Sequence, residues 1–508
     1  MSASILNFPR ALLTMRLSTA WRLTIFFGLL FSGTIALLNV APRAESAYSL
    51  APFWLLTATI CAICVVPTIL DSGRPEFELV TARNVFVLYC LLLFVFFPVI
   101  VYFGEYSTSG TVPLTFFSSR YWEALKGQAY VAIGMFVFQL VYYLRWNRRV
   151  SRRSRPNGFI LRIQPRKLKP AIFILSSMGV LSFLYLAYSQ GGIRSFLANM
   201  GDFRDEGMAG TGPIFLGMNL LYFAFVLAYS SYIGNRKHGA LALVLFFLTI
   251  LIGLLGAYRH LAVDTVITAV VIRHYGYRRL KLSVNLCLFI ALFIILNLAY
   301  VDLRQPGVNA ESVELILRNS PVMNTLYYGF FSRFLGPEAM ARIIDITPEV
   351  GHTGGPLLLL TLATFWVPRA FWPSKPPPML TYSNFVFFPE SFIYFAEGGA
   401  VSPTVEGTFY WVAGLAGMVV GMALLAVIFA SADKFIVRRR DLFGFAFYAN
   451  TFIFAAFVSE MVDLHFERFL LRALVWGILF FVCGQKVAVN SRKQYPDYAT
   501  AEREGAKN

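Results

Sequence analysis

Long apolar segments alternate with short polar ones along most of the chain. The apolar segments have roughly 15 to 23 residues, close to the roughly 20 that an α-helix needs to cross a bilayer. Asp264 interrupts one of these segments. The pattern predicts an all-α integral membrane protein with about twelve transmembrane helices, at 22–40, 50–70, 85–103, 128–146, 171–188, 213–233, 239–256, 261–275, 282–300, 408–430, 443–460 and 466–485.

The composition agrees with this pattern. Hydrophobic residues make up 57% of the 508 positions, charged residues make up 14%, and the mean hydropathy is +0.63. Such values exclude a soluble domain. The net charge is +17, but Lys and Arg gather in short segments between the apolar runs. This distribution indicates a lipid bilayer as the environment and no nucleic-acid partner.

The positions of Lys and Arg also predict how the helices are oriented. Positively charged loops stay in the cytoplasm, and the connection after the fourth predicted helix holds Arg145, Arg148, Arg149, Arg152, Arg153, Arg155, Arg162, Arg166, Lys167 and Lys169. Both termini are then cytoplasmic, and the outer segments are 41–49, 104–127, 189–212, 256–260, 301–407 and 459–467. We expect a multi-pass protein of a bacterial inner (cytoplasmic) membrane.

Four parts of the chain follow from this topology. They are helices 1–9 with short loops at 1–300, a large extracytoplasmic loop at 301–407, helices 10–12 at 408–486 and a cytoplasmic tail at 487–508. A structureless loop as long as 301–407 is uncommon in a compact protein unless it is functional. We expect it to cap a cavity that opens to the outer side.

Helical patterns recur inside this large loop. They occur at Glu311–Leu317 and at Pro337–Ile344. Leu357–Trp366 is too short to cross a bilayer and fits a helix that lies at the interface or dips partly inward. The next segment, Val367–Pro376, is rich in prolines, which remove backbone donors and restrict their neighbours, so it is expected to be rigid and non-helical.

Arginines on the predicted outer side oppose the usual charge distribution of membrane proteins. The candidates for substrate binding among them are Arg194, Arg204, Arg259, Arg369, Arg468 and Arg472. Each can be a side chain that reaches water or forms an ion pair at the rim. Gathered at one membrane face, several guanidinium groups would instead suit a diphosphate, because each binds phosphate oxygens through two donors.

Acid–base chemistry has a candidate on the same side. His352 lies in Gly351–Gly355, a turn that opens the apolar helix, and an imidazole that titrates near neutrality can take a proton from a sugar hydroxyl. An exposed histidine in a helix-entry turn is the competing interpretation. The alternatives for the base are Glu390, Glu397, Glu406, Asp463, His465 and Glu467. No His and Asp cluster has metal-ligand spacing, so neither a metal nor another cofactor is expected.

Several of these stretches resemble the bacterial O-antigen and oligosaccharide-repeat-unit polymerases, the Wzy-type membrane proteins. Val367–Pro376 is similar to the Pro-Arg…Trp-Pro-x-Lys-Pro run in the large outer loop of that family. Weaker similarities lie at Gly256–Arg259, at Gly191–Arg194 with Asp202–Arg204, and at Gly399–Gly407 with Gly414 and Gly417. The likeness covers most of the chain in layout and a few short stretches in motif.

The resemblance implies a C-type glycosyltransferase fold and a polymerase of undecaprenyl-diphosphate-linked repeat units. Such an enzyme transfers the growing glycan to a new unit at the outer face of the membrane. For such an activity we expect Arg259, Arg369 and Arg194 or Arg204 to hold the diphosphates, with Arg468 or Arg472 in support. His352 is the candidate base, and Trp372 and Lys375 are expected along the glycan path. A chain-length regulator protein is a further implied partner. The first outer loop contains Glu45 but lacks the paired acidic motif of many C-type enzymes, so the base must come from elsewhere.

Three other functions share this layout. A ligase would move the finished glycan from lipid diphosphate to an outer acceptor and would need the same arginines. A flippase or secondary transporter would show two related halves and helices broken near the midplane, and the sequence contains no such repeat. A scaffold of a polysaccharide machine would need no chemistry at all.

Overall fold

In the computed structural model, the described residues are 51–71, 78, 80–96, 121–147, 159–198, 212–256, 259–277, 336–364, 367, 372, 374–375, 379–388, 403–439, 441–459 and 462–488. The predicted helices at 22–40, 282–300 and Glu311–Leu317 lie outside them.

Each of the ten predicted spans within the described residues contains a helix. These helices are α3 (Ala51–Asp71), α4 (Ala82–Leu91) with its π-helical continuation η2 (Leu92–Phe96), α7 (Tyr121–Asn147), α8 (Pro165–Ser189), α11 (Gly212–Asn235), α12 (Gly239–Leu255), α13 (Arg259–Gly276), α21 (Val405–Arg438), α22 (Leu442–Phe457) and α23 (Val462–Cys483). Among the described helices, α3, α7, α8, α11 and α21 are long and apolar enough to cross a membrane. The protein is therefore a helical membrane protein, whereas the total of about twelve spans and the C-type fold stay predictions.

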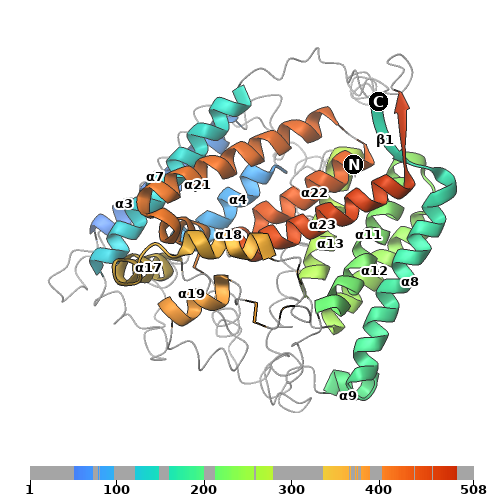
Figure 1. The fold of residues 1–508 in the computed structure, drawn as a ribbon. Coiled ribbons are helices and arrows are strands. Elements are labelled where there is room, and N and C mark those ends of the chain that lie inside the picture. The colour runs from blue at the N-terminus through green and yellow to red at the C-terminus, as the bar shows by residue number, and fades with distance from the viewer. Residues whose placement is uncertain are drawn as a thin grey trace, which may run out of the picture.

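Two hydrophobic cores lie side by side, and α21, α22 and α23 contribute buried residues to both. One core is formed mainly by α8, α11, α12, α13, α22 and α23, and the other mainly by α3, α4, α7, α21 and α22. Figure 1 shows the first group on the right, the second on the left, and α22 and α23 between them. The pattern of apolar residues on all sides of these helices is typical of helices that pack on one face and contact lipid on the other.

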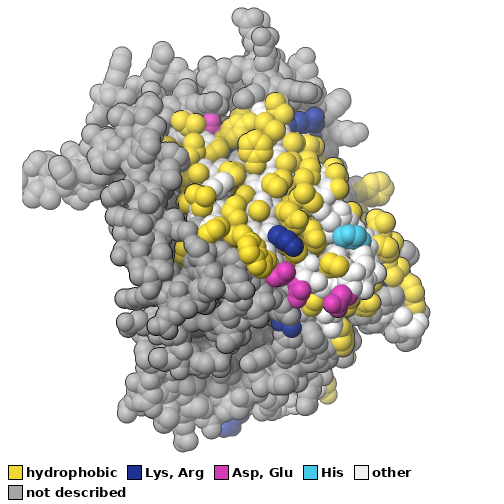
Figure 2. Space-filling model, turned by 90° about the vertical axis from the view of Figure 1, so that its left-hand side faces the viewer, with side chains coloured by type: hydrophobic (Ala, Val, Ile, Leu, Met, Phe, Trp, Pro, Cys, Tyr) yellow, Lys and Arg dark blue, Asp and Glu magenta, His cyan; other side chains and the backbone are white. Residues whose placement is uncertain are grey.

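The outward faces of α3 and α7 are strongly apolar. Leu55, Phe136, Leu140 and Leu144 are among their large exposed hydrophobic side chains. Figure 2 shows hydrophobic side chains gathered over this side of the molecule, with acidic side chains at the margins of the apolar area. An apolar surface of this extent is expected where a helix bundle contacts acyl chains.

One short sheet departs from the predicted all-α fold. Strand β1 (Phe159–Ile163) pairs antiparallel with β2 (Gly484–Ala488), with Phe159 opposite Ala488 and Ile163 opposite Gly484. The sequence analysis did not predict this sheet, because the cation-rich connection was interpreted only by its charge. Its Phe-Ile-Leu-Arg-Ile segment has the aromatic and β-branched residues that favour a strand.

Contacts between helix ends agree with the predicted alternation of the chain. Lys167 Nζ at the start of α8 donates to Val482 O near the end of α23, at 2.8 Å. Lys434 Nζ near the end of α21 donates to Arg145 O near the end of α7. The sequence analysis places these four helix ends on one face of the membrane, and each of the two contacts joins two of them. That this face is the cytoplasmic one rests on its cations and stays a prediction.

A buried aspartate ties both cores together at that end. Asp433 of α21 accepts hydrogen bonds from Tyr142 of α7 at 2.8 Å, from Tyr448 of α22, and from the backbone N–H of Ala82 at 3.0 Å. Because the carboxylate is 1% exposed, these donors replace water. The network fixes α4, α7, α21 and α22 relative to one another.

Three described helices belong to the segment that is predicted to be the large outer loop, 301–407. They are α17 (Gly336–Val350), α18 (Gly354–Thr364) and α19 (Met379–Phe387). Helix α17 covers the predicted helix 337–344, and α18 occupies most of Leu357–Trp366. Leu359 of α18 is 70% exposed, as suits a helix at the interface. Figure 1 shows α18 lying across the bundle near α21 and α23, with α17 and α19 beside it.

Candidate functional site

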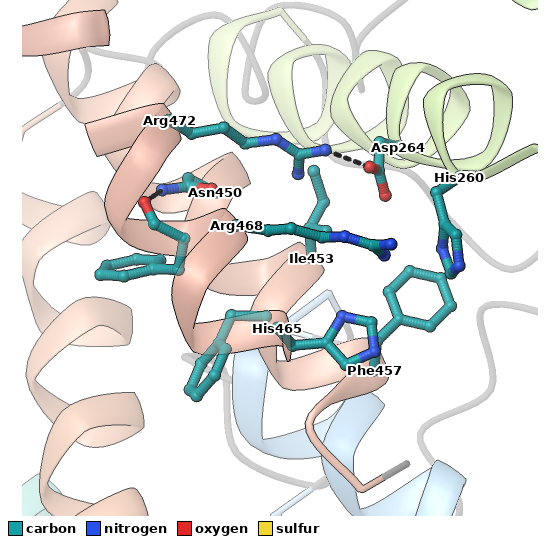
Figure 3. Close-up of a pocket in the computed structure, with 10 residues that line it drawn as sticks. His260, Asp264, Asn450, Ile453, Phe457, His465, Arg468 and Arg472 are labelled. Carbon is teal, nitrogen blue, oxygen red and sulfur yellow. Dashed lines mark hydrogen bonds and ion pairs between the residues drawn. The ribbon is translucent and has the colours of Figure 1, made fainter. Parts of the chain in front are cut away.

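A polar pocket opens among α13, α22 and α23, at the end of the bundle opposite to the sheet. The space between atoms there amounts to about 240 Å³ with open solvent included, and the part that can hold a molecule is about the size of one water. Its walls combine charged, imidazole and aromatic groups from these three helices: His260, Asp264, Asn450, Ile453, Phe454, Phe457, His465, Arg468, Phe469 and Arg472. Figure 3 shows Arg468 and Arg472 reaching from α23 toward Asp264 and His260 of α13, while the Asn450 amide points toward the backbone of α23.

Helical periodicity brings these groups together. His260 and Asp264 are four residues apart on α13, and so are Arg468 and Arg472 on α23, so each pair shares a helix face. Helices α22 and α23 are joined by the short connection 458–461, which sets them as an antiparallel pair. The pocket therefore forms where the first turns of α13 and α23 meet the last turns of α22.

An ion pair closes the inner side of the pocket. Arg472 Nη2 donates to Asp264 Oδ2, and both side chains are buried, at 5% and 2% exposure for the residues. The Arg472 guanidinium also lies over the Tyr222 ring, 5.1 Å from its centroid. Tyr222 is itself held by a 3.0 Å hydrogen bond between its hydroxyl and that of Thr268. Charge pairing and the aromatic face together compensate the loss of water around this arginine.

The mouth of the pocket is lined by imidazoles and a second arginine. His465 stacks on Phe457 with ring centroids 5.5 Å apart, and His260 meets His465 at 6.0 Å. Figure 3 shows the Arg468 guanidinium reaching between Asp264 and His260. Of the described lining residues, Arg468 and Arg472 carry positive charge and Asp264 carries negative charge. The pocket is thus suited to an anion, which guanidinium groups bind through paired donors.

The pocket includes part of the predicted arginine set. Arg468 and Arg472 line it together, and His465, an alternative for the base, lies one helical turn before Arg468. Arg259 is the first residue of α13, directly before His260, and its side chain lies outside the described part. Arg194 is exposed on the short helix α9 (Ile193–Ala198) and is not a lining residue. Arg204 and Arg369 lie outside the described residues.

His352 lies elsewhere, at the junction of α18 with α21. Helix α21 is broken at Ala413 and Gly414, where Gly414 has φ 63° and ψ −151°. The break leaves Trp411 O available, and His352 Nδ1 lies 3.3 Å from that oxygen. Since a carbonyl oxygen only accepts, Nδ1 carries a proton, so in the neutral imidazole Nε2 is the nitrogen with the lone pair. His352 is exposed and is not among the described residues that line the pocket.

The predicted glycan-path residues form local contacts in the outer segment. Trp372 Nε1 donates to Ser374 Oγ at 3.0 Å, and Lys375 Nζ donates to Val367 O at 3.2 Å. The lysine thus closes a loop within its own proline-rich run. Neither side chain lines the pocket, so their proposed role along a glycan path stays a prediction.

Three polar lining residues, His260, Asp264 and Asn450, were not among the predicted site residues. Asp264 was recognised as a charge interrupting an apolar segment, four residues after His260, but its pairing with Arg472 requires the packing of α13 on α22 and α23. Asn450 donates from Nδ2 to Phe469 O at 2.9 Å and is 2% exposed. In the sequence, Asn450 is a lone amide within the apolar segment that forms α22. Such a residue is explained by packing alone as readily as by a role in a site.

The chain matches no protein-family model, no curated protein and no solved structure.

Proposed function

We propose that this protein is a membrane glycosyltransferase that polymerises undecaprenyl-diphosphate-linked oligosaccharide repeat units at the outer face of a bacterial inner membrane. The observation that carries the proposal is the pocket in which Arg468 and Arg472 converge with His260 and His465 at one end of the membrane helices. The resemblance of Val367–Pro376 to the polymerase run supports the same activity from a separate part of the chain.

The pocket fits the charge that this reaction must handle. When the growing glycan moves to a hydroxyl of the new unit, its lipid diphosphate leaves with the bonding electrons and an additional negative charge. Preorganised guanidinium groups in a site with little water stabilise such a charge more strongly than water does. Arg468 and Arg472 are placed for that role, and Asp264 holds Arg472 in position.

The acceptor hydroxyl must lose a proton, and described histidines occur at two places that suit a base. His352 has its tautomer set by Trp411 O, which leaves Nε2 able to accept a proton. His260 and His465 face each other at the mouth of the pocket. We assign the base to His352, whose side chain is exposed and whose Nδ1 is engaged by Trp411 O, and treat the pocket histidines as the alternative.

The broken helix α21 does not favour a transporter. After the break, residues 415–438 continue for about 24 residues, or about 36 Å at 1.5 Å per residue, which is enough to cross the bilayer alone. The break therefore lies near the outer end, whereas transporters place broken helices near the midplane. A ligase would use the same pocket, and the products of the reaction separate it from a polymerase.

The contribution of the pocket is tested by Arg468→Ala. We expect at least a hundredfold loss of chain extension, since one lost charge-assisted contact to a developing charge costs about 3 kcal/mol. Membrane amounts and the midpoint of thermal unfolding should match wild type. Arg166→Ala is the matched control, because Arg166 is exposed in the first turn of α8, at the end of the helix bundle away from the pocket. Wild-type polymer from Arg468→Ala would remove the pocket from the mechanism.

A further inference from the structure

Basic and aromatic side chains meet where α11 and α13 end and α12 begins, away from the pocket. Arg236 follows the last residue of α11, and its guanidinium lies over two rings. It is 4.4 Å from the ring centroid of Tyr277, directly after α13, and 5.7 Å from that of Tyr232 in α11. Rings from two segments thus define the position of an arginine whose side chain is exposed.

A second arginine, Arg273, belongs to the same group. It lies four residues before Tyr277, whose N–H donates to Arg273 O at 3.1 Å, so the two side chains share a helix face. The Arg273 side chain hydrogen-bonds to Tyr229, and Tyr229 stacks on Tyr232 with ring centroids 6.5 Å apart. These contacts link two arginines and three tyrosines into one basic–aromatic cluster: Tyr229, Tyr232, Arg236, Arg273 and Tyr277.

The cations of this cluster have no acidic partner. Among the residues that the structure describes, no carboxylate forms an ion pair with Arg236, Arg273 or the adjacent, exposed Lys237. By contrast, Arg83 at the start of α4 pairs with Asp71 at 3.3 Å. Stacking on a ring uses the flat face of a guanidinium and leaves its N–H edges for another acceptor. Three positive charges are therefore available here to an anion.

An exposed apolar stripe begins beside the cluster. Helix α12 starts at Gly239, two residues after Lys237, and Leu243, Phe247 and Leu251 follow along it at every fourth position. All three are more than half exposed. Such a stripe contacts acyl chains in a bilayer, and tyrosines with cations at its end are typical of the boundary between chains and headgroups. This surface offers charge to a headgroup and apolar area to the chains below it.

We propose that the basic–aromatic cluster, together with Lys237, binds the phosphate of an anionic glycerophospholipid whose acyl chains lie along α12. Guanidinium groups bind phosphate oxygens through paired donors, and the Lys237 ammonium adds a point charge. A zwitterionic lipid carries a cation of its own, which the three positive charges repel, so the cluster selects a headgroup with net negative charge. This inference does not depend on the proposed glycosyl transfer.

The test measures lipid binding to the purified, delipidated full chain by native mass spectrometry. The probes are phosphatidylglycerol and phosphatidylethanolamine with identical acyl chains, so only the headgroup differs. Each cation near a headgroup contributes roughly fivefold in affinity, which predicts that the first phosphatidylglycerol binds at least about tenfold more tightly than the first phosphatidylethanolamine. Inorganic phosphate is added as a competitor and should not displace the lipid, because it has no acyl chains to bury.

Two variants assign this preference to the cluster. Arg236→Gln removes one charge and should lower the ratio of the two affinities about fivefold. Tyr277→Leu keeps all three charges but removes a ring that holds Arg236, and it should lower the ratio about twofold to threefold. Arg166→Gln is the matched control, because it removes one exposed cation from the same end of the helix bundle, in the first turn of α8. It should leave the ratio unchanged.

Equal affinities for the two lipids would overturn the inference. So would an equal fall of the ratio in Arg236→Gln and Arg166→Gln, because the general positive charge of this face, rather than the cluster, would then select the lipid. Displacement of phosphatidylglycerol by inorganic phosphate would show a site for soluble anions and reject the lipid. Thermal unfolding in lipid-free detergent verifies that each variant is folded, and Arg273→Gln, also at an exposed position, replaces any variant that is not.

Discussion

Glu338 is a carboxyl group that α17 buries outside the membrane-spanning helices. It lies in the first turn of α17 and is 9% exposed. Burial raises the pKa of this carboxyl from 4.5 to about 7. The folded protein therefore holds a proton that the unfolded chain has lost between these two pH values, and the free energy of unfolding falls as the pH rises through this window.

This shift predicts how Glu338→Gln behaves. Below about pH 4.5 the variant and the wild type should unfold alike, because both side chains are neutral. At pH 8 the variant should be more stable by on the order of 3 kcal/mol, since a buried carboxylate has been removed. Thermal unfolding in detergent at pH 5 and pH 8 measures the difference. Glu349→Gln, at an exposed position of α17, should leave the pH dependence unchanged; equal curves for both variants would contradict the assignment.

His352 offers a residue-scale test of the base. Asn can place its Nδ2 where the imidazole has Nδ1, so His352→Asn keeps the donor to Trp411 O and loses Nε2. We expect the variant to fold like wild type and to lose chain extension by a factor of at least a hundred. If it extends chains normally, His352 serves the α18–α21 junction alone, and the base is then sought at His260 and His465.

The break in α21 is the main irregularity among the long helices. Gly414 adopts a positive φ that side chains rarely tolerate, and a Cβ added there would lie 3.4 Å from His352 Cε1. On the other side of the junction, Trp411 is fully buried, and its Nε1 donates to Thr353 Oγ1 at 3.2 Å. The break therefore determines how α18 packs against α21.

Gly414→Ala should accordingly destabilise the protein by about 1–3 kcal/mol and lower chain extension. Gly477→Ala is the matched control, because Gly477 lies inside helix α23 and a Cβ there meets no atom within 4 Å. That control should be neutral or slightly stabilising, as expected for alanine in a helix. The comparison uses unfolding midpoints in detergent, and similar midpoints for the two variants would show that the break is not constrained.

At the scale of elements, hydrophobic run length predicts the helices well, because a segment that is apolar on all sides has few alternatives in lipid. The boundaries are less predictable. The tenth predicted span, 408–430, covers only part of α21, which is longer and is broken at Gly414. The length of an apolar run does not show where such a break occurs. The strand β1 was missed for a related reason, because its partner β2 is more than 300 residues away in the chain.

At the scale of the whole molecule, the sequence could place Arg468 and Arg472 on one helix face but could not find what faces them. Asp264 joins Arg472 across 208 positions of the chain. Likewise, Asp433 accepts hydrogen bonds from Tyr142, Tyr448 and Ala82, and no local sequence pattern predicts this network. Such long-range polar contacts depend on how the two cores pack, and helical periodicity describes each helix alone.

The most direct measurement of the proposed activity is the product distribution of the purified full chain with undecaprenyl-diphosphate-linked repeat units. We predict a ladder of lengthening glycans that stay on lipid diphosphate, with one lipid diphosphate released for each unit added. A single transfer to a different lipid acceptor would show a ligase instead. Unchanged substrates, in a preparation whose fold is verified by thermal unfolding, would contradict the assignment of a glycosyltransferase.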